Sequence, residues 1–272
     1  INSNVVIGDE NDEIVVMEAD EFDRSFLQLT PYISIVTSID ADHLDIYGDK
    51  EQLVQGFEQF VNKTKSDGVV ICNQSLQLVT TRKKLTYGIE NADVMARNIR
   101  IENELTKFSV VTKEGLEMGD YEMQLFGIHN VMNALAAIMA CLQLRVDMKV
   151  IKEGLAAFQG VQRRFDIRFR SESVCYIDDY AHHPEEIKAT LKAAREIYPE
   201  REMTVVFQPH LFTRTRDFMD EFAEALSLAD KVILMEIYPA REKPIPGITS
   251  SALLEKISCK EKQICQKDEL LA

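Results

Sequence analysis

The sequence lacks several features that mark membrane, secreted and nucleic-acid-binding proteins. No apolar run approaches the roughly 20 residues that cross a bilayer, and no charged-then-apolar leader opens the chain. The formal net charge of −14 argues against binding to duplex nucleic acid, because contacts to phosphates favour a basic surface. We therefore expect a cytoplasmic globular protein with no membrane insertion and no nucleic-acid partner.

Cysteine is scarce, and other recurring patterns are missing. The cysteines are Cys72, Cys141, Cys175, Cys259 and Cys265. None is at CxxC spacing, so we expect reduced thiols and neither disulfides nor a zinc site. The chain has no solenoid repeat, no low-complexity tract and no GxxxxGK[ST] phosphate loop; Asn62-Lys63-Thr64 lacks the glycines of that loop. Because the first residue is Ile1 and not Met, we expect a piece of a longer protein.

Apolar runs of strand length alternate with segments of helical period, which predicts an α/β fold built mainly on parallel strands. A chain of 272 residues is long enough for two domains. The segment Gln159–Gln162 is the best boundary, so we expect a first domain over residues 1–159 and a second over residues 160–272. Between about Leu85 and Phe126, two-residue alternation predicts an antiparallel meander at the edge of the first domain.

The expected elements follow from the same periodicity. In the first domain we expect strands over 14–17, 33–39 and 69–72, and helices over 51–65, 129–144 and 148–158. In the second domain we expect strands over 174–177, 203–207 and 232–235, and helices over 185–197 and 216–228.

Polar clusters follow five of the apolar runs. They are Glu18–Glu21, Asp40–Asp45, Asp178–His183, Gln208–His210 and Glu236. In open parallel sheets, ligands bind in the crevice beyond the carboxyl ends of the strands. We therefore expect these clusters to line a functional crevice.

Glu18 and His43 are the sharpest pair among these clusters. On adjacent strands, their side chains could converge on one divalent cation. Oxygen ligands suit Mg²⁺ and imidazole favours Zn²⁺ or Mn²⁺, so the residue types leave the metal open. The alternative is that Glu18 belongs to a solvated acidic lip and His43 caps a turn.

The segment Gly127–Asn133 opens a predicted helix, where free backbone N–H groups and the positive end of the helix dipole favour anions. His129 and Asn133 are four residues apart, so both could reach one ligand. The alternative is that His129 or Asn130 only caps the helix.

Two arginine pairs stand out in an otherwise acidic sequence. Arg163 and Arg164 follow the domain boundary and could clamp phosphate oxygens across the cleft between the domains. Arg214 and Arg216 follow the 203–207 strand and suit a carboxylate or a phosphorylated substrate, with Thr213 or Thr215 as a cap. The alternatives are a surface pair in a charged hairpin, and ion pairs of Arg214 and Arg216 with Asp217 and Asp220.

Seven motifs, taken together and in order, resemble one enzyme family. They are EADE at Glu18–Glu21, DADHLD at Asp40–Asp45, GIHNVMNALAA at Gly127–Ala137, QGVQRRFD at Gln159–Asp166, DDYAHHP at Asp178–Pro184, FQPHLFTRTRD at Phe207–Asp217 and EIYPAREKPIPG at Glu236–Gly247. This combination is similar to the Mur ligases of peptidoglycan synthesis, in particular to the members that join L-alanine to UDP-N-acetylmuramate. The resemblance implies a central ATPase-like domain with a mostly parallel sheet, followed by a Rossmann-like α/β domain.

The resemblance also implies roles for single residues. ATP phosphorylates the muramyl carboxylate, and the amine of L-alanine attacks the acyl phosphate. Glu18 and His43 are implied magnesium ligands, with manganese as a possible substitute. His129, Asn130 and Asn133 are implied to hold the nucleotide, and Arg164 and Asp179 its phosphates and ribose. Tyr180, His182, His210 and Arg214 are implied to receive the amino acid and the muramyl carboxylate. The implied catalytic set is Glu18, His43, Arg164, His182, His210 and Arg214.

The sequence also departs from the family pattern. The phosphate loop and the UDP-binding domain, which the family carries upstream, are missing, as is the last part of the C-terminal domain. We therefore expect the isolated 272 residues to be inactive and a longer parent to be active. Some members have an arginine where this chain has Leu211, so one substrate contact is lost or supplied elsewhere.

Three other functions compete with this one. A recycling ligase that joins a ready-made tripeptide to UDP-N-acetylmuramate shares the same motifs; the short Leu27–Pro31 link favours the alanine enzyme. A non-catalytic nucleotide-binding scaffold would have little reason to keep Glu18, His43, Arg164 and Asp179 together. A metal-dependent hydrolase would act without ATP and bind zinc.

The oligomeric state is expected to be a monomer or a weak homodimer.

Overall fold

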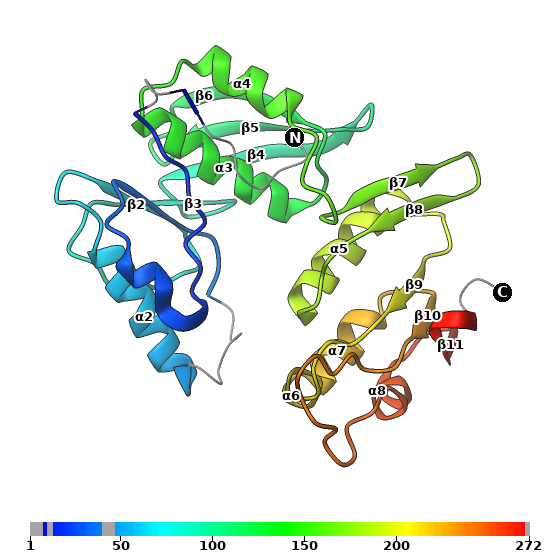
Figure 1. The fold of residues 1–272 in the computed structure, drawn as a ribbon. Coiled ribbons are helices and arrows are strands. Elements are labelled where there is room, and N and C mark those ends of the chain that lie inside the picture. The colour runs from blue at the N-terminus through cyan, green and yellow to red at the C-terminus, as the bar shows by residue number, and fades with distance from the viewer. Residues whose placement is uncertain (1–7, 10–12, 40–46, 270–272) are drawn as a thin grey trace. The chain divides into compact units, whose positions relative to one another are not determined.

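The structure is a computed structural model that describes residues 8–9, 13–39 and 47–269 (Figure 1). Contacts between residues divide the chain into two compact units, residues 1–88 and residues 89–272. Within the described ranges, no helix is long and apolar enough to span a membrane. All five cysteines are free thiols, as the sequence predicts.

The first unit contains three parallel strands, β1 (Ile33–Val36), β2 (Val69–Asn73) and β3 (Lys84–Gly88). Strand β2 lies between the other two, and its residues from Val69 to Cys72 are all buried. Such a continuous apolar run is typical of a parallel strand that is covered on both faces.

Helix α2 (Lys50–Asn62) begins at Asp49, whose side chain accepts a hydrogen bond from the backbone N–H of Gln52. On its buried side, the ring of Phe60 stacks on Phe26 with the ring centroids 5.0 Å apart. Phe26 belongs to a short 3₁₀ segment, η1 (Phe22–Gln28). The helix expected over 51–65 is therefore confirmed, with its end three residues earlier.

Two expectations for this part of the chain are wrong. Residues 14–17 form no strand, and their side chains are 54% to 93% exposed. A strand needs neighbours for its backbone hydrogen bonds, and no described strand pairs with this segment. The antiparallel meander also starts later than expected, because β3 pairs in parallel with β2.

The second unit begins with an antiparallel meander of β4 (Val94–Glu102), β5 (Leu105–Thr112) and β6 (Glu117–Met123). Helices α3 (Ile128–Gln143) and α4 (Met148–Ala157) follow. Helix α3 buries Val131, Leu135 and Ile138 at helical spacing, so its apolar stripe is core as the sequence predicts. Both helices confirm the expected ranges within one residue.

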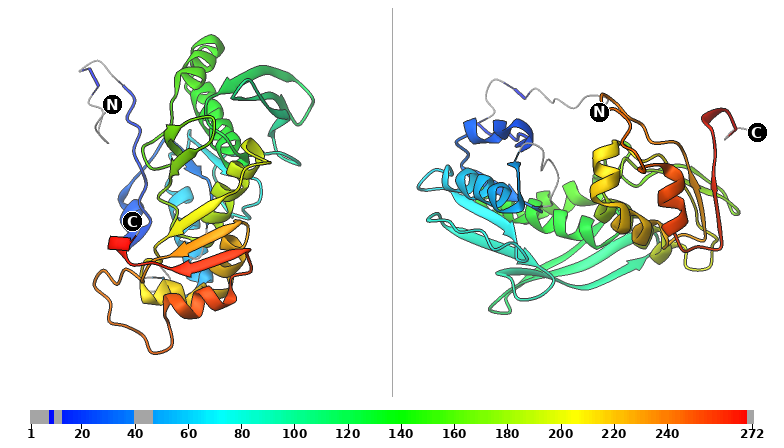
Figure 2. Two further views of the ribbon diagram at one scale, coloured as in Figure 1. Left: turned by 90° about the vertical axis from the view of Figure 1, so that its right-hand side faces the viewer. Right: turned by 90° about the horizontal axis from the view of Figure 1, so that it is seen from below.

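The α/β alternation then restarts. An antiparallel hairpin of β7 (Asp166–Arg170) and β8 (Cys175–Asp178) is followed by α5 (Pro184–Ile197). The parallel strands β9 (Thr204–Phe207), β10 (Lys231–Leu234) and β11 (Glu261–Ile264) lie side by side with β10 in the middle (Figure 2). Between and after them lie α6 (Phe212–Asp217), α7 (Met219–Leu226), α8 (Ser250–Lys256) and the 3₁₀ turn η2 (Lys267–Glu269).

Side chains of α5, α7 and α8 pack with Phe207, Val232 and Leu234 of this sheet to form one apolar core. The α/β class is therefore confirmed. The single helix expected over 216–228 is wrong, because Phe218 (φ −122°, ψ 27°) ends α6 and begins α7. The ring of Phe218 packs edge-on against His183, with the centroids 4.7 Å apart, and this contact accompanies the break.

Asp230 connects several segments of this domain at the edge opposite the strand-end clusters. Its carboxylate lies 2.7 Å from Nη2 of Arg195 and 3.3 Å from Nζ of Lys260, and it accepts a hydrogen bond of 3.0 Å from the backbone N–H of Met203. The Arg195 guanidinium and the Met203 amide hold the pKa of Asp230 well below its usual range. The charged carboxylate therefore stabilises the fold.

Replacing the Asp230 carboxylate tests its contribution to the stability of the fold. Asp230→Asn is expected to lower the free energy of unfolding by about 2 kcal/mol, because partly buried partners lose a charged acceptor. Because folding lowers the pKa of Asp230, its stabilisation is present above the ordinary carboxyl pKa of about 4 and is lost as the pH falls through the lower folded value. The measurement is urea unfolding of wild type and variant at several pH values.

The difference in the free energy of unfolding between wild type and Asp230→Asn should be constant near neutral pH and shrink in acid. Asp220→Asn is the matched control, because Asp220 is 81% exposed and has only an exposed ion pair with Lys256. Equal effects of the two substitutions, or a difference that grows in acid, would contradict this assignment.

Candidate functional site

Asp179 holds together the segments that meet after strand β8. Its carboxylate accepts hydrogen bonds from the backbone N–H of Phe165 and of Ala181, both at 2.7 Å, and from Oγ1 of Thr190 at 3.1 Å. These donors lie before β7, after β8 and on α5. The carboxylate therefore sets the position of the arginine segment 163–164 relative to the loop 180–183.

The two arginines of that segment surround Tyr180. The guanidinium carbons of Arg163 and Arg164 lie 4.7 Å and 6.0 Å from the centre of the Tyr180 ring. Arg163 also pairs with Asp178 at 3.6 Å, and Arg164 pairs with Glu186 at 3.1 Å. These are surface ion pairs, as the alternative interpretation predicts. Both arginine side chains are about half exposed, so they are also accessible to an anionic ligand.

The ends of β9 and β10 bring His210 and Tyr238 together. Residues 210 and 238 form a parallel bridge, and their rings stack with the centroids 5.5 Å apart at 18°. Burial lowers the pKa of His210, as do the nearby charges of Arg214 and His182, while Glu242 acts in the opposite direction. The structure therefore places His182, His210 and Arg214 within electrostatic range of one another.

The start of α6 differs from the expected cap. Its N-cap residue is Leu211 (φ +73°), whose side chain makes no capping hydrogen bond, and the backbone N–H of Thr213 donates instead to the Glu242 carboxylate at 3.0 Å. Thr215 donates to the carbonyl of Leu211 at 2.8 Å, and Thr213 donates to Glu242. Arg216 pairs with its neighbour Asp217 at 2.7 Å, as the alternative interpretation predicts.

Sequence reasoning missed two carboxylates, Glu186 and Glu242. Glu242 accepts hydrogen bonds from both the backbone N–H and the hydroxyl of Thr213 and so ties the loop after β10 to α6. Nothing local to Glu242 indicates a partner 29 residues away. Glu186 could have been found, because it stands three residues after the His183 cap, the spacing of a capping box.

The start of α3 gathers His129 and Asn130 around Gly127. The Asn130 amide donates to the carbonyl of Phe126 at 2.8 Å and lies 3.1 Å from Nε2 of His129. No side chain caps this helix, so the capping alternative for His129 and Asn130 is wrong. Gly127 has φ +88°, and a Cβ there would lie 2.8 Å from the His129 ring, so the glycine makes room for the histidine.

An apolar pocket of about 370 Å³ lies between α3, α4 and the end of β6. Asn130 and Asn133 contribute to it together with Ala134, Ala137, Phe158 and other apolar residues. Two of the residues expected to hold a nucleotide therefore border one pocket. Its apolar walls and few polar groups are typical of sites for flat organic rings.

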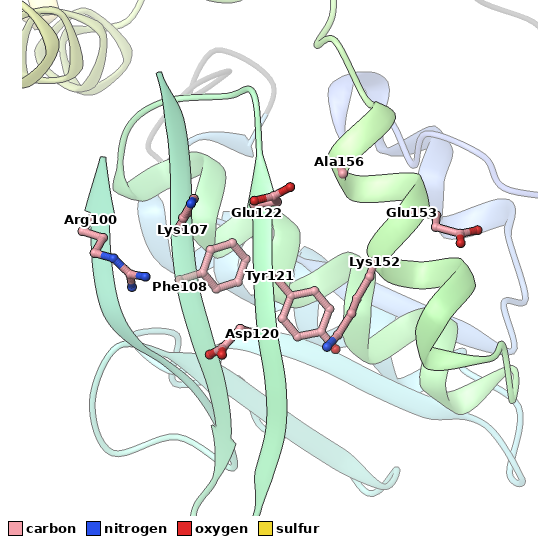
Figure 3. Close-up of a pocket in the computed structure, with 9 residues that line it drawn as sticks. All are labelled: Arg100, Lys107, Phe108, Asp120, Tyr121, Glu122, Lys152, Glu153 and Ala156. Atoms are coloured by element: carbon pink, nitrogen blue, oxygen red, sulfur yellow. The ribbon is translucent and has the colours of Figure 1, made fainter. Parts of the chain in front are cut away.

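A second groove, of about 480 Å³, lies over β4, β5, β6 and α4 (Figure 3). It is lined by cations and carboxylates in equal number around Phe108 and Tyr121, and Lys152 lies 5.3 Å from the Tyr121 ring centre. None of the residues that the sequence singled out lines it.

The predicted metal pair is described only in part. Glu18 is exposed, and His43 lies, with the rest of Asp40–Asp45, outside the described residues. Within the described ranges, no group of three or more His, Cys, Asp or Glu side chains is arranged to hold a metal ion. The metal site therefore stays a prediction.

Known proteins resemble this chain along nearly its whole length. The profile of the "Mur ligase middle domain" matches residues 4–141, and that of the "Mur ligase, glutamate ligase domain" matches residues 163–271. A protein of Christiangramia forsetii named UDP-N-acetylmuramate–L-alanine ligase is 44% identical over 99% of this chain and 58% of its own length. The chain thus spans about 58% of the length of that curated relative.

Solved structures agree with these matches. A UDP-N-acetylmuramate–alanine ligase from Thermotoga maritima superposes with a TM-score of 0.72 at 28% identity, over 90% of this chain and 53% of that one. The MurF ligase of the same organism, solved in complex with ADP, shares the fold with a TM-score of 0.65 at 18% identity, over 88% of this chain and 53% of that one.

His129 offers a test of the arrangement at the start of α3. Burial lowers the pKa of this imidazole from the ordinary 6.5, and the charge of Asp179 partly offsets the effect. His129 should therefore titrate below 6.5, and Asp179→Asn should lower its pKa further, because a negative charge favours the imidazolium. The measurement is an NMR titration of the ring, with Asp178→Asn as the control. A pKa that stays constant or rises in Asp179→Asn would contradict the arrangement.

Proposed function

The chain belongs to the Mur ligase family, and on that premise we propose that it carries out part of the ATP-dependent joining of L-alanine to UDP-N-acetylmuramate. The observation that carries the proposal is the 44% identity, over 99% of the chain, to a relative named for this reaction. A cytoplasmic location belongs to the proposal, and the free thiols support it.

The reaction needs no covalent bond to the protein. A carboxylate oxygen of the muramyl group attacks the γ-phosphorus of ATP, which releases ADP and forms an acyl phosphate. The amine of L-alanine then attacks the acyl carbon, loses a proton and expels inorganic phosphate, which leaves the amide. The protein therefore acts by positioning the reactants and by stabilising the phosphoryl charge.

The start of α3 is proposed to hold the nucleotide. The apolar pocket beside Asn130 and Asn133 suits the flat face of an adenine ring, and the amides suit its polar edge. His129 supports the local structure through its contact with Asn130. The ADP bound by a solved family member supports a nucleotide as the ligand.

Arg164 and Asp179 are proposed to act on the phosphates and the ribose. Arg164 is half exposed, and its planar guanidinium can donate two hydrogen bonds to one phosphate. Asp179 already accepts three hydrogen bonds from the protein, so its main effect is to place Arg164.

Glu18 and His43 are proposed to hold Mg²⁺, with Mn²⁺ as a substitute. The exposed carboxylate of Glu18 leaves oxygens available, which suits a hard cation. When bound, the metal ion would neutralise charge on the phosphate oxygens.

Tyr180, His182, His210 and Arg214 are proposed to receive the amino acid and the muramyl carboxylate. They follow β8 and β9, and the stacking of His210 on Tyr238 fixes one wall of this region. Leu211 brings no charge where some members have an arginine, so Arg214 is the cation nearest in the chain to His210.

Acceptor choice tests the proposed reaction. The complete protein that contains this chain should release phosphate from ATP only when UDP-N-acetylmuramate and an acceptor are both present, and L-alanine should be the preferred acceptor. The measurement compares kcat/KM for L-alanine with that for the tripeptide L-alanyl-γ-D-glutamyl-diaminopimelate. A preference for the tripeptide would replace this function by that of a recycling ligase.

Filling the pocket beside α3 tests the nucleotide site. Ala137→Phe is expected to weaken ADP binding at least about tenfold, because the larger side chain would overlap the ligand. A steric cost of about 1.4 kcal/mol already corresponds to a tenfold lower affinity. Ala156→Phe is the matched control, because this alanine of α4 lines the groove of Figure 3 instead. The measurement is calorimetric titration with ADP, and equal affinities of the two variants would contradict the assignment.

A further inference from the structure

Glu186, in the first turn of α5, contacts two separate parts of the site. One carboxylate oxygen accepts a hydrogen bond of 3.1 Å from Nη1 of Arg164, which lies 22 residues earlier in the chain. The other oxygen accepts from the backbone N–H groups of His182 at 2.9 Å and of His183 at 3.2 Å. A single side chain therefore joins the arginine segment, the histidine loop and the helix.

A role limited to capping the helix does not account for this geometry. The amides of His182 and His183 engage only Oε2, and a glutamine could accept from them equally well. The second oxygen, Oε1, is directed to the guanidinium of Arg164. The negative charge of Glu186 is needed for this second contact and not for the first.

The electrostatic surroundings agree with a charged carboxylate at this position. Burial pushes the pKa of Glu186 upward, but the His182 amide, the His182 ring and the Arg164 guanidinium outweigh it and lower the pKa. The carboxylate is therefore ionised at neutral pH.

Arg164 depends on this carboxylate for its position. The other described contact of its side chain is to the face of the Tyr180 ring, at 6.0 Å, and this side chain is 52% exposed. An arginine side chain held by so distant a ring alone would sample many rotamers, and ordering it at the moment of ligand binding would cost affinity. The carboxylate is itself held by two amides, so it offers the guanidinium a fixed anchor.

We propose that Glu186 is a positioning residue, which orders Arg164 for the nucleotide phosphates and at the same time holds the His182 loop for the acceptor side. This inference rests on the proposed function, because it assigns Arg164 to the phosphates. Glu186 acts through its neighbours and touches no substrate.

The experiment compares two neighbouring glutamates of the same helical turn in the complete protein. Glu186→Gln keeps an acceptor for the amides and removes the charge that holds Arg164. Glu185→Gln removes an equal charge one residue away, from an exposed side chain whose charge acts on Lys188. The probe is ADP carrying a fluorescent N-methylanthraniloyl group, and KM for ATP and for L-alanine is measured in parallel.

Glu186→Gln should weaken ADP binding about tenfold, the loss expected when a charged hydrogen bond that orders the ligand contact is removed. KM for ATP should rise by a similar factor, with a smaller change in KM for L-alanine. Glu185→Gln should bind ADP within about twofold of wild type, because exposed charges contribute little.

A second comparison separates positioning from general stability. In an Arg164→Ala background, Glu186→Gln should weaken ADP binding by less than about twofold, because the residue through which it acts is gone. Equal losses in both backgrounds would show that Glu186 only stabilises the fold and would overturn the inference. Thermal unfolding of all variants identifies any that fail to fold.

The outcomes also separate this inference from the function on which it rests. A complete wild-type protein that binds no ADP would overturn the proposed function and the inference together. Tight binding by wild type and an unchanged affinity in Glu186→Gln would overturn the inference alone.

Discussion

The hydrogen bonds to Asp179 are the constraint on which the rest of the site depends. Asp179 immediately follows β8, and its carboxylate receives donors from the arginine segment, from its own loop and from α5. Strands and helices alone would leave these three segments free to shift, because each joins the fold through a loop. The shared carboxylate links them, so functional groups that are distant in sequence are held near one another.

Carboxylates take this role repeatedly in a protein whose net charge is −14. Asp179 orders the loops, Glu186 holds Arg164, and Glu242 holds the start of α6, from which Arg214 projects. The ligands of a phosphoryl-transfer reaction are anions, so the groups that contact them should be cations. In this arrangement Glu186 pairs with Arg164, and Glu242 holds the helix that carries Arg214, so the acidic residues order the proposed cationic contacts.

Local patterns in the sequence predicted most of the fold. The apolar stripe of α3 and the buried run of β2 are properties of short segments, and both were found where expected.

The break at Phe218 was missed because it accompanies a ring contact with His183, 35 positions away in the numbering. The hairpin strand β7 was missed because three of the five residues of its sequence, DIRFR, are charged and because it gains its stability from pairing with β8. The strand over 14–17 was wrong because an apolar run indicates a strand only where a neighbour can pair with it. In the site, motif positions could be predicted, and the capping-box spacing marks Glu186. The pairing of Glu186 with Arg164 and that of Glu242 with Thr213 depend on tertiary contacts that no local spacing encodes.

In the proposed reaction the substrate carboxylate, and no group of the protein, is activated by phosphorylation. The most direct measurement uses UDP-N-acetylmuramate labelled with ¹⁸O in its carboxylate, together with ATP, L-alanine and the complete protein that contains this chain. Mass spectrometry of the released inorganic phosphate should find one ¹⁸O atom in each molecule, because the oxygen that attacks phosphorus leaves with it. Phosphate without the label, formed together with the amide, would contradict activation of the substrate carboxylate by phosphorylation.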